Sequence, residues 1–201
     1  MKLAALISGG KDSVYAAYLA KQSNEITTIV SMHSENPESY MFHYPNTWIV
    51  EVQAWLMGIP YVAQSTQGQK ELELEDLETI LKQLSSTESI EGVVTGAVAS
   101  SYQKQRIDTI CEKLGLSSIA PLWSKEPAET VAGMINDGFE IIIQAVAAPP
   151  LDERWLGKKL DFECLVELVK LNKQYGIHVN GEGGEYDSLV VEGSHLLLHV
   201  I

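Results

Sequence analysis

Through residues 1–115 the chain alternates between short apolar segments and longer segments with helical periodicity. The apolar segments are expected to form buried strands at residues 2–7, 26–32, 61–63 and 92–95. Helices are expected between them, at residues 12–22, 47–57, 73–84 and 102–114. Repeated strand-then-helix units form a parallel sheet with helices on both faces. The sequence therefore predicts an α/β fold with a doubly wound, Rossmann-like sheet.

The pattern changes near Pro121, and strands and helices no longer alternate. Helices are expected at residues 127–137 and 162–175, and a long apolar strand at residues 139–148. Residues 189–192 and 195–201 look like a closing pair of strands around Gly193. We therefore expect a large domain over residues 1–125 and a smaller α+β domain over residues 126–201. No long linker separates them, so the two parts are expected to pack together.

Composition narrows the class of protein. The 201 residues include 14 Lys and Arg against 27 Asp and Glu, a net charge of −13, which argues against a broad nucleic-acid-binding surface. No apolar run approaches the ~18 residues of a membrane span. Cys111 and Cys164 are too far apart for a Cys-x-x-Cys redox pair or a disulfide framework. We expect a cytoplasmic protein without stable nucleic-acid or membrane partners, and a homo-oligomer is compatible with the sequence.

A glycine-rich segment follows the first expected strand and begins the first expected helix. Its residues are Ser8, Gly9, Gly10, Lys11, Asp12 and Ser13. Two glycines let the backbone turn tightly, and the helix start offers unpaired N–H groups and the positive end of a dipole. Lys11 adds a positive charge, so the segment predicts a phosphate site. It matches neither G-x-x-x-x-G-K-[ST] nor G-x-G-x-x-G, and the alternative is an ordinary turn with Asp12 or Ser13 near the helix cap.

Two more segments lie at the carboxyl ends of expected strands, where ligands of open α/β sheets bind. In residues 33–46, Tyr40 and His43 either line a nucleotide or substrate pocket or pack under a long loop. In residues 95–106, the spacing puts Tyr102 and Arg106 on one helical face.

The chain has only two arginines, Arg106 and Arg154. A guanidinium binds phosphate or carboxylate through two bonds, and the alternative for each residue is a surface salt bridge.

A second glycine-rich segment, near the end of the chain, carries two acids. Glu182 and Glu185 flank Gly183 and Gly184 between an expected helix and an expected strand. The two carboxylates can hold Mg²⁺, take a proton from ammonium or bind a cationic substrate group. The alternative is a glycine turn with two solvated acids.

Residues 8–13 resemble the PP-loop of the N-type ATP pyrophosphatases, whose fold is that of the adenine nucleotide alpha hydrolases. The whole chain resembles one branch of that superfamily, the diphthine–ammonia ligase (ATP-binding 4) family. The matching stretches, in family order, are residues 38–43, 95–98, 101–103, Arg106, 121–123, 151–152, 155–157 and 181–186. The stretches Tyr-Met-Phe-His and Glu-Gly-Gly-Glu-Tyr are the specific ones, whereas the PP-loop alone indicates only the superfamily.

The resemblance implies that ATP, with Mg²⁺, activates the carboxylate of diphthine on translation elongation factor 2. An acyl-adenylate would form, and ammonium would supply the nitrogen of diphthamide, since the chain has no room for a glutaminase domain. The alternatives are a tRNA-modifying PP-loop enzyme and a nucleotide sensor without turnover. Two isolated cysteines and the charge of −13 weigh against the first alternative, and the intact loop with its acidic partners weighs against the second.

The motifs and the resemblance together assign roles to individual residues. Catalysis is assigned to Lys11, Asp12, Glu182 and Glu185. ATP binding is assigned to Ser8, Gly9, Gly10, Lys11, Asp12, Ser13, Gly96 and Arg106. Substrate binding is assigned to Tyr40, His43, Tyr102, Gln103, Arg154, Gly183, Gly184 and Tyr186. Asp12 is the expected protein ligand of Mg²⁺.

Overall fold

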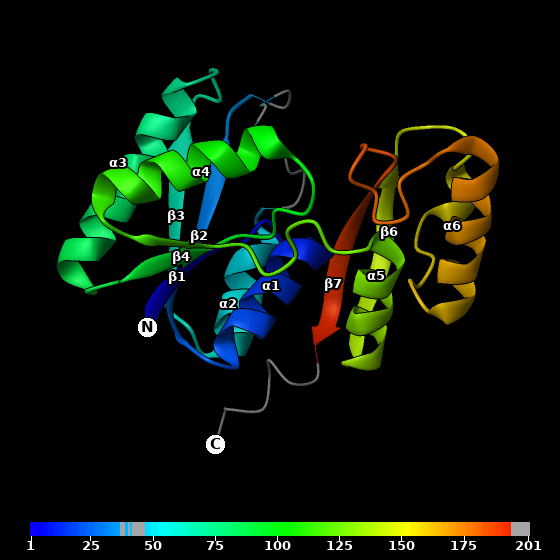
Figure 1. Ribbon diagram of the computed structural model, residues 1–201, viewed down its shortest axis with the longest axis horizontal. Helices are drawn as coiled ribbons and strands as arrows, with labels where there is room; N and C mark the ends of the chain where they lie inside the picture. Colours follow the sequence, from blue (N-terminus) through cyan, green and yellow to red (C-terminus); the bar gives the residue numbers. More distant parts are fainter. Residues whose placement is uncertain (37–38, 40, 42–46, 194–201) are drawn as a thin grey trace.

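The computed structural model describes residues 1–36, 39, 41 and 47–193. Five parallel strands form the main sheet: β1 (Lys2–Leu6), β2 (Glu25–Ser34), β3 (Tyr61–Thr66), β4 (Gly92–Val94) and β5 (Ser117–Ile119). Their order is β3-β2-β1-β4-β5, so the chain starts in the middle of the sheet and extends it in both directions (Figure 1). The four expected strands are confirmed. The fifth, β5, was not expected because its three residues include only one large apolar side chain.

Helices cover both faces of this sheet. The first face carries α1 (Lys11–Lys21) and α2 (Ile49–Met57), and the other carries α3 (Leu72–Thr87) and α4 (Ser101–Leu114). Side chains alternate along β1 accordingly: Leu3 and Ala5 join the apolar cluster of α1 and α2, whereas Ala4 joins the cluster of α3 and α4. The doubly wound α/β fold expected from the sequence is confirmed.

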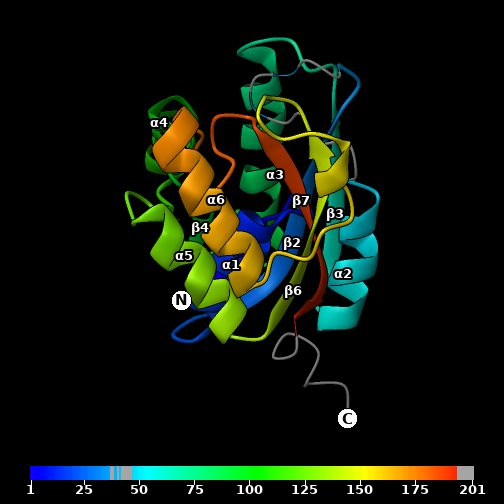
Figure 2. The same cartoon turned by 90° about the vertical axis from the view of Figure 1, so that its right-hand side faces the viewer.

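The remaining elements form a smaller α+β unit beside α1. They are α5 (Pro127–Asn136), β6 (Phe139–Val146), the short 3₁₀ helix η1 (Glu153–Trp155), α6 (Phe162–Tyr175) and β7 (Tyr186–Gly193). Strands β6 and β7 pair antiparallel, and α5 and α6 lie on their far side (Figures 1 and 2). The strand expected at residues 189–192 is confirmed as part of β7, which pairs with β6. Residues 195–201 lie outside the described residues.

The two parts share one apolar core. Helices α1 and α2 lie between the five-stranded sheet and the β6–β7 pair (Figure 1). One side of these helices packs on the main sheet, and the other side is partly covered by the β6–β7 pair. Val14 of α1 and Ile141 of β6 belong to the same buried cluster, and both are fully buried. The ring of Tyr15 meets that of Phe139 edge-on, with centroids 5.3 Å apart. The expectation that the two parts pack together is confirmed, and their joint is a packed interface.

Tyr15 adds a polar bond to this joint and offers a test of it. Its hydroxyl donates to Asp137 Oδ2 over 2.8 Å, and burial, followed by this bond, raises the pKa of Tyr15, so the hydroxyl stays a donor. Tyr15→Phe removes the donor and leaves a half-buried carboxylate unpaired, so we expect the free energy of unfolding in urea to fall by about 1–2 kcal/mol. Tyr175→Phe, at an exposed hydroxyl, is the control. Equal unfolding midpoints for the two variants would contradict this role.

Both cysteines are buried and unpaired. Burial is the main cause that raises the pKa of each thiol to about 11, so neither is a ready thiolate at neutral pH. Among the described residues, none of the helices combines the length and apolar character needed to cross a bilayer.

Candidate active site

A cavity of about 340 Å³ lies at the carboxyl ends of the parallel strands, where the two parts meet. Its wall includes the glycine-rich loop after β1, the start of α4 and the segment that leads into β7. This is the position at which open α/β sheets bind ligands. The lining is polar at the loop, and its apolar part includes residues of the cluster under α3 and α4: Leu6, Val30, Met32, Met41 and Ile107.

The loop of residues 8–13 is held from three sides. Within the loop, the Ser8 N–H donates to Ser13 Oγ over 3.1 Å. From α2, the Gln53 amide donates to the Gly9 carbonyl oxygen over 3.3 Å and to the Val190 carbonyl oxygen over 3.0 Å. From β7, the Val190 N–H donates to that same Gly9 oxygen over 3.3 Å. The loop conformation therefore depends on both parts of the fold.

Gly96 marks a close approach between the end of β4 and the start of α1. A Cβ at Gly96 would lie 2.5 Å from the Ser13 nitrogen and 2.6 Å from its Cα. Only glycine fits there, because these are backbone atoms that cannot rotate away. In the described part of the chain, the structure records no acceptor for the backbone N–H groups of Gly10 and Asp12. These N–H groups at a helix start suit an anion such as phosphate.

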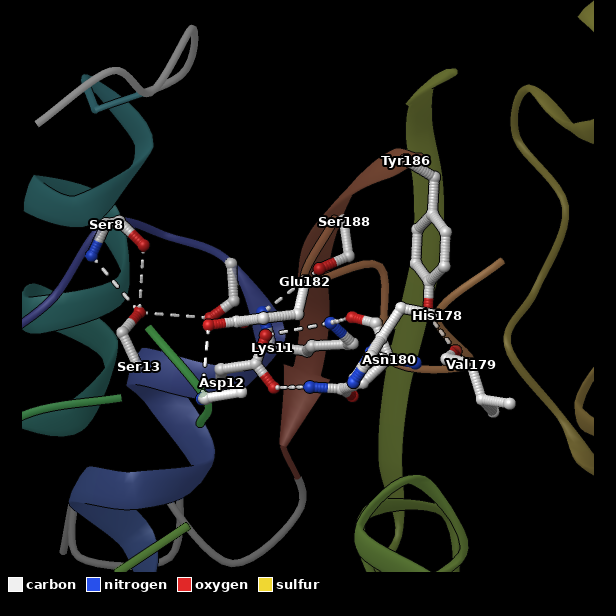
Figure 3. Close-up of polar contacts among 12 residues, drawn as sticks. Ser8, Lys11, Asp12, Ser13, His178, Val179, Asn180, Glu182, Tyr186 and Ser188 are labelled. Carbon is white, nitrogen blue, oxygen red and sulfur yellow. Dashed lines mark hydrogen bonds and ion pairs between the residues drawn. The ribbon is translucent and has the colours of Figure 1, made fainter. Parts of the chain in front are cut away.

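Lys11 and Asp12 form an ion pair that faces the C-terminal part, in which Lys11 is buried and Asp12 is part-buried (Figure 3). Lys11 is 3% exposed, and its Nζ donates to Asp12 Oδ2 over 2.8 Å and to the Asn180 carbonyl oxygen over 2.7 Å. The Asn180 side-chain amide donates to Asp12 Oδ1 over 2.7 Å. The backbone N–H of Lys11 donates to Ser188 Oγ over 3.2 Å. Lys11 keeps a third N–H for which no acceptor is recorded among the described residues.

Glu182 enters the cavity from the C-terminal part, and its side chain extends toward the start of α1 (Figure 3). Its Oε1 accepts the N–H groups of Ala99 and Ser100, each over 3.3 Å, just ahead of α4. Burial, and then the nearby charge of Asp12, raise the pKa of the Glu182 carboxyl, while the two N–H groups and Lys11 oppose the shift. Glu182 is therefore a carboxylate that takes up a proton more readily than a solvated glutamate.

The structure separates the two acids that the sequence could not separate. Glu185 is not part of the cavity wall. It is 9% exposed, and its Oε1 accepts the His178 N–H over 2.6 Å, so it braces the segment that precedes Glu182. Gly183 lies outside the wall as well, whereas Gly184 and Tyr186 are part of it. The Tyr186 hydroxyl donates to the Val179 carbonyl oxygen over 2.9 Å.

Of the residues expected at the start of α4, Gln103 lines the cavity, whereas Tyr102 and Arg106 do not. Arg106 stacks over the Tyr102 ring at 3.5 Å and donates to Glu71 Oε1 over 2.6 Å. Arg154 is exposed, and its guanidinium pairs with Asp152 two residues away. The structure therefore brings neither arginine into the cavity. Tyr40 and His43 lie outside the described residues.

Two sequence models of known domains cover nearly all of the chain. The diphthamide synthase N-terminal domain matches residues 1–118, and the diphthamide synthase C-terminal domain matches residues 126–197. The chain belongs to the diphthamide synthase family.

Curated relatives in this family are named diphthine–ammonia ligase. The Bos taurus protein is 32% identical over 96% of this chain and 79% of its own length. The Homo sapiens protein is 31% identical over 99% of this chain and 86% of its own length. The Schizosaccharomyces pombe protein is 32% identical over 96% of this chain, which corresponds to 34% of its own length. Family members thus carry the same unit in chains of different length.

A solved structure supports the fold of this family member. The crystal structure of a predicted subunit of tRNA methyltransferase from Methanocaldococcus jannaschii superposes with a TM-score of 0.51. The match covers 95% of this chain and 96% of the other, at 17% sequence identity. At that identity the likeness shows the fold alone.

In this diphthamide synthase family member, three residues of the site were not singled out from the sequence. They are Gln53, Asn180 and Ser188. Gln53 gave a signal, because it interrupts the apolar, buried face of α2. Asn180 also gave one, since it directly precedes the Gly-Glu-Gly-Gly-Glu-Tyr stretch. Ser188 gave none, because only its contact with Lys11, across 177 positions of sequence, places it at the loop.

Proposed function

We propose that the chain is an ATP-dependent diphthine–ammonia ligase that converts diphthine on translation elongation factor 2 into diphthamide. The observation that carries the proposal is a single cavity in which a phosphate-type loop faces Glu182, a carboxylate with a raised pKa. Relatives named diphthine–ammonia ligase match this chain over nearly its whole length.

The cavity has two ends suited to the two ends of ATP. The N–H groups of Gly10 and Asp12, which have no recorded acceptor within the described residues, receive the phosphates at the start of α1. The apolar end, between Val30, Met32 and Ile107, receives the adenine ring. The third N–H of Lys11 offsets charge that develops on the departing pyrophosphate.

The site also fits Mg²⁺ in the manner usual for nucleotide enzymes. Among the described residues, no three His, Cys, Asp or Glu side chains gather into a metal cage. Mg²⁺ bound with a nucleotide needs only one or two protein carboxylates, because phosphates and water complete its coordination. Each carboxylate oxygen of Asp12 accepts one hydrogen bond, from Lys11 or from Asn180. Each oxygen keeps a further lone pair, so Asp12 can supply such a ligand. When bound, Mg²⁺ would neutralise phosphate charge.

The reaction proceeds in two steps that the cavity can hold in sequence. The diphthine carboxylate attacks the α-phosphorus of ATP, which forms an acyl-adenylate and releases pyrophosphate. Ammonium then loses a proton to Glu182, and the ammonia formed attacks the acyl carbon, which yields the amide and AMP. Much of the rate would come from holding carboxylate and α-phosphorus in line. The raised pKa of Glu182 suits it to accept the proton.

We assign residues 1–125 to nucleotide binding and residues 126–201 to the presentation of Glu182. Elongation factor 2 is then the macromolecular substrate, and the cytoplasm is the expected compartment. A tRNA-thiolating activity is disfavoured, because the two cysteines are buried with raised pKa values and lie outside the cavity wall.

Reconstitution tests this proposal directly. The protein is incubated with Mg-ATP, ammonium and elongation factor 2 that carries diphthine. AMP is measured by chromatography, and the factor is measured by mass spectrometry for the replacement of a hydroxyl by an amino group. We expect AMP and amide in equal amounts, only when all components are present. AMP release that requires tRNA instead, or ATP binding without any AMP, would overturn the proposal.

A further inference from the structure

We propose that Asn180 is a positioning residue that aligns the Lys11–Asp12 pair for catalysis. This inference rests on the proposed function, because it concerns the same phosphate loop. Asn180 is 1% exposed and lies in the C-terminal part, whereas Lys11 and Asp12 begin α1 in the N-terminal part. One residue therefore reaches across the joint and contacts both members of the pair.

The contacts of Asn180 fix the two charges separately. Its backbone carbonyl accepts from Lys11 Nζ over 2.7 Å, and its side-chain amide donates to Asp12 Oδ1 over 2.7 Å. Because Lys11 bonds to the other oxygen of Asp12, the carboxylate is held at both oxygens. Neither side chain can then rotate without breaking a bond in a buried setting, where an unpaired polar group is costly.

The segment around Asn180 is itself braced, so it can act as a fixed reference for the loop. The Asn180 N–H donates to His178 Nδ1 over 3.2 Å, and the Gly181 N–H donates to the His178 carbonyl oxygen over 2.9 Å. Gly181 has a φ of 71°, and a Cβ there would lie 2.9 Å from the Tyr186 carbonyl oxygen. Glu185 and Tyr186 bond to the same segment at His178 and Val179. Two residues of the Glu-Gly-Gly-Glu-Tyr stretch thus support Asn180.

The unpaired oxygen of Asn180 indicates what the residue is there to do. Its Oδ1 is buried and has no partner among the described residues. The amide orientation is nevertheless fixed, because only the NH₂ group can donate to the Asp12 carboxylate. A buried oxygen without a partner lowers stability. Asn180 Oδ1 is left in that state because the NH₂ group of the same amide donates to Asp12. Asn180 therefore serves the geometry of the loop at the expense of its own hydrogen bonding.

Two variants and a matched control test this role. Asn180→Ala removes the amide and keeps the backbone contact with Lys11. Asn180→Asp keeps the shape of the side chain but sets a carboxyl oxygen where an N–H donor met Asp12. The control is Asn172→Ala, which removes a comparable 2.7 Å amide bond to the Ile177 carbonyl oxygen, away from the cavity. The measurements are kcat and KM for ATP in AMP formation, the melting temperature, and the Kd of a non-hydrolysable ATP analogue by calorimetry.

We expect kcat to fall about tenfold in Asn180→Ala and roughly a hundredfold in Asn180→Asp, while KM for ATP changes less than about threefold. Asn172→Ala should lower the melting temperature and leave kcat unchanged. A simple packing role would reverse the order, because the aspartate variant preserves volume. The proposal is overturned if Asn180→Asp keeps wild-type kcat, or if both Asn180 variants lose kcat only in proportion to their loss of stability.

Failure of the proposed function would be recognised separately. If the wild-type protein releases no AMP with diphthine-bearing elongation factor 2, the ligase assignment fails. The Kd of the ATP analogue then still tests Asn180, since Asn180→Asp should weaken analogue binding measurably, within the same limit of about threefold, and more than Asn180→Ala does. Equal Kd values for the wild type and Asn180→Asp, in that case, would overturn the positioning role.

Discussion

Glu182→Gln is expected to lower the rate of amide formation roughly 10²- to 10⁴-fold, the usual contribution of a general base. The glutamine oxygen can still accept the N–H groups of Ala99 and Ser100, so the start of α4 keeps its contacts. What is lost is the ability to take a proton from ammonium. KM for ATP should change little, because the substitution keeps these contacts and leaves the loop of residues 8–13 unaltered.

The pH profile gives this prediction a second readout. Glu182 must be ionised to act as a base, and burial raises its pKa above the ordinary value. Activity should therefore decline, as pH falls, at a higher pH than a solvated glutamate would give. The Glu182→Gln variant should lose this acidic limb along with its rate. A variant that keeps wild-type turnover and the same limb would show that another group receives the proton.

Glu185→Gln is the matched control, since it makes the same chemical change three residues away. Its side chain points into the segment at His178, and a glutamine oxygen can still accept that N–H. We expect most of the turnover to remain, with any loss appearing in the melting temperature. Equal losses of turnover in the Glu182 and Glu185 variants would mean that both acids act through the fold alone.

Gly96→Ala is the second change with a large expected effect. The added Cβ would meet the Ser13 nitrogen at 2.5 Å and the Asp12 carbonyl carbon at 2.7 Å. Relief requires the start of α1 to move away from β4, and overpacking of this kind costs about 1–3 kcal/mol of stability. The same movement shifts the phosphate loop, and a displacement of about 1 Å can lower turnover roughly 10²-fold. Steady-state AMP formation and urea unfolding measure the two effects.

Gly115→Ala separates strain from displacement. Gly115 follows α4 with a φ of 70°, and nothing lies within 4 Å of the added Cβ. Alanine there costs only the left-handed backbone strain, about 1–2 kcal/mol. Turnover should stay at the wild-type level while stability falls. Similar turnover in the Gly96 and Gly115 variants would mean that the approach of β4 does not control the loop.

The sequence predicted local structure well and long-range pairing poorly. Helix α4 was expected within a residue of its bounds, because its end is marked by Gly115. Strand β5 was missed because two of its three residues are serine. The pairing of β7 with β6 was not predicted, because the choice of a partner distant in sequence depends on packing against α1. Local periodicity carries no information about that choice.

The same limit applies to the site. A phosphate site could be predicted at residues 8–13 because its requirements are local: two glycines, a lysine and a helix start; the structure places most of this loop in the cavity wall. Glu182 and Glu185 flank the same two glycines, so no local signal could show that one faces the cavity and the other faces His178. Arg106 is paired with Glu71, and Arg154 is paired with Asp152. In each case the acid competes with a phosphate or substrate carboxylate for the guanidinium group. Such competition becomes visible only when the partners are placed in space.

The contacts that hold the phosphate loop also bear on the order in which the molecule acquires its structure. Ser188 reaches Lys11 across 177 positions of sequence, and Val190 reaches Gln53 across 137. Closing such large loops is slow, because much chain entropy is lost before any contact is gained. During refolding the β1–β2–β3 part of the sheet can assemble from segments close in sequence while the loop is still without its β7 support. If the loop binds nucleotide as proposed, we expect that binding to report a late stage of folding.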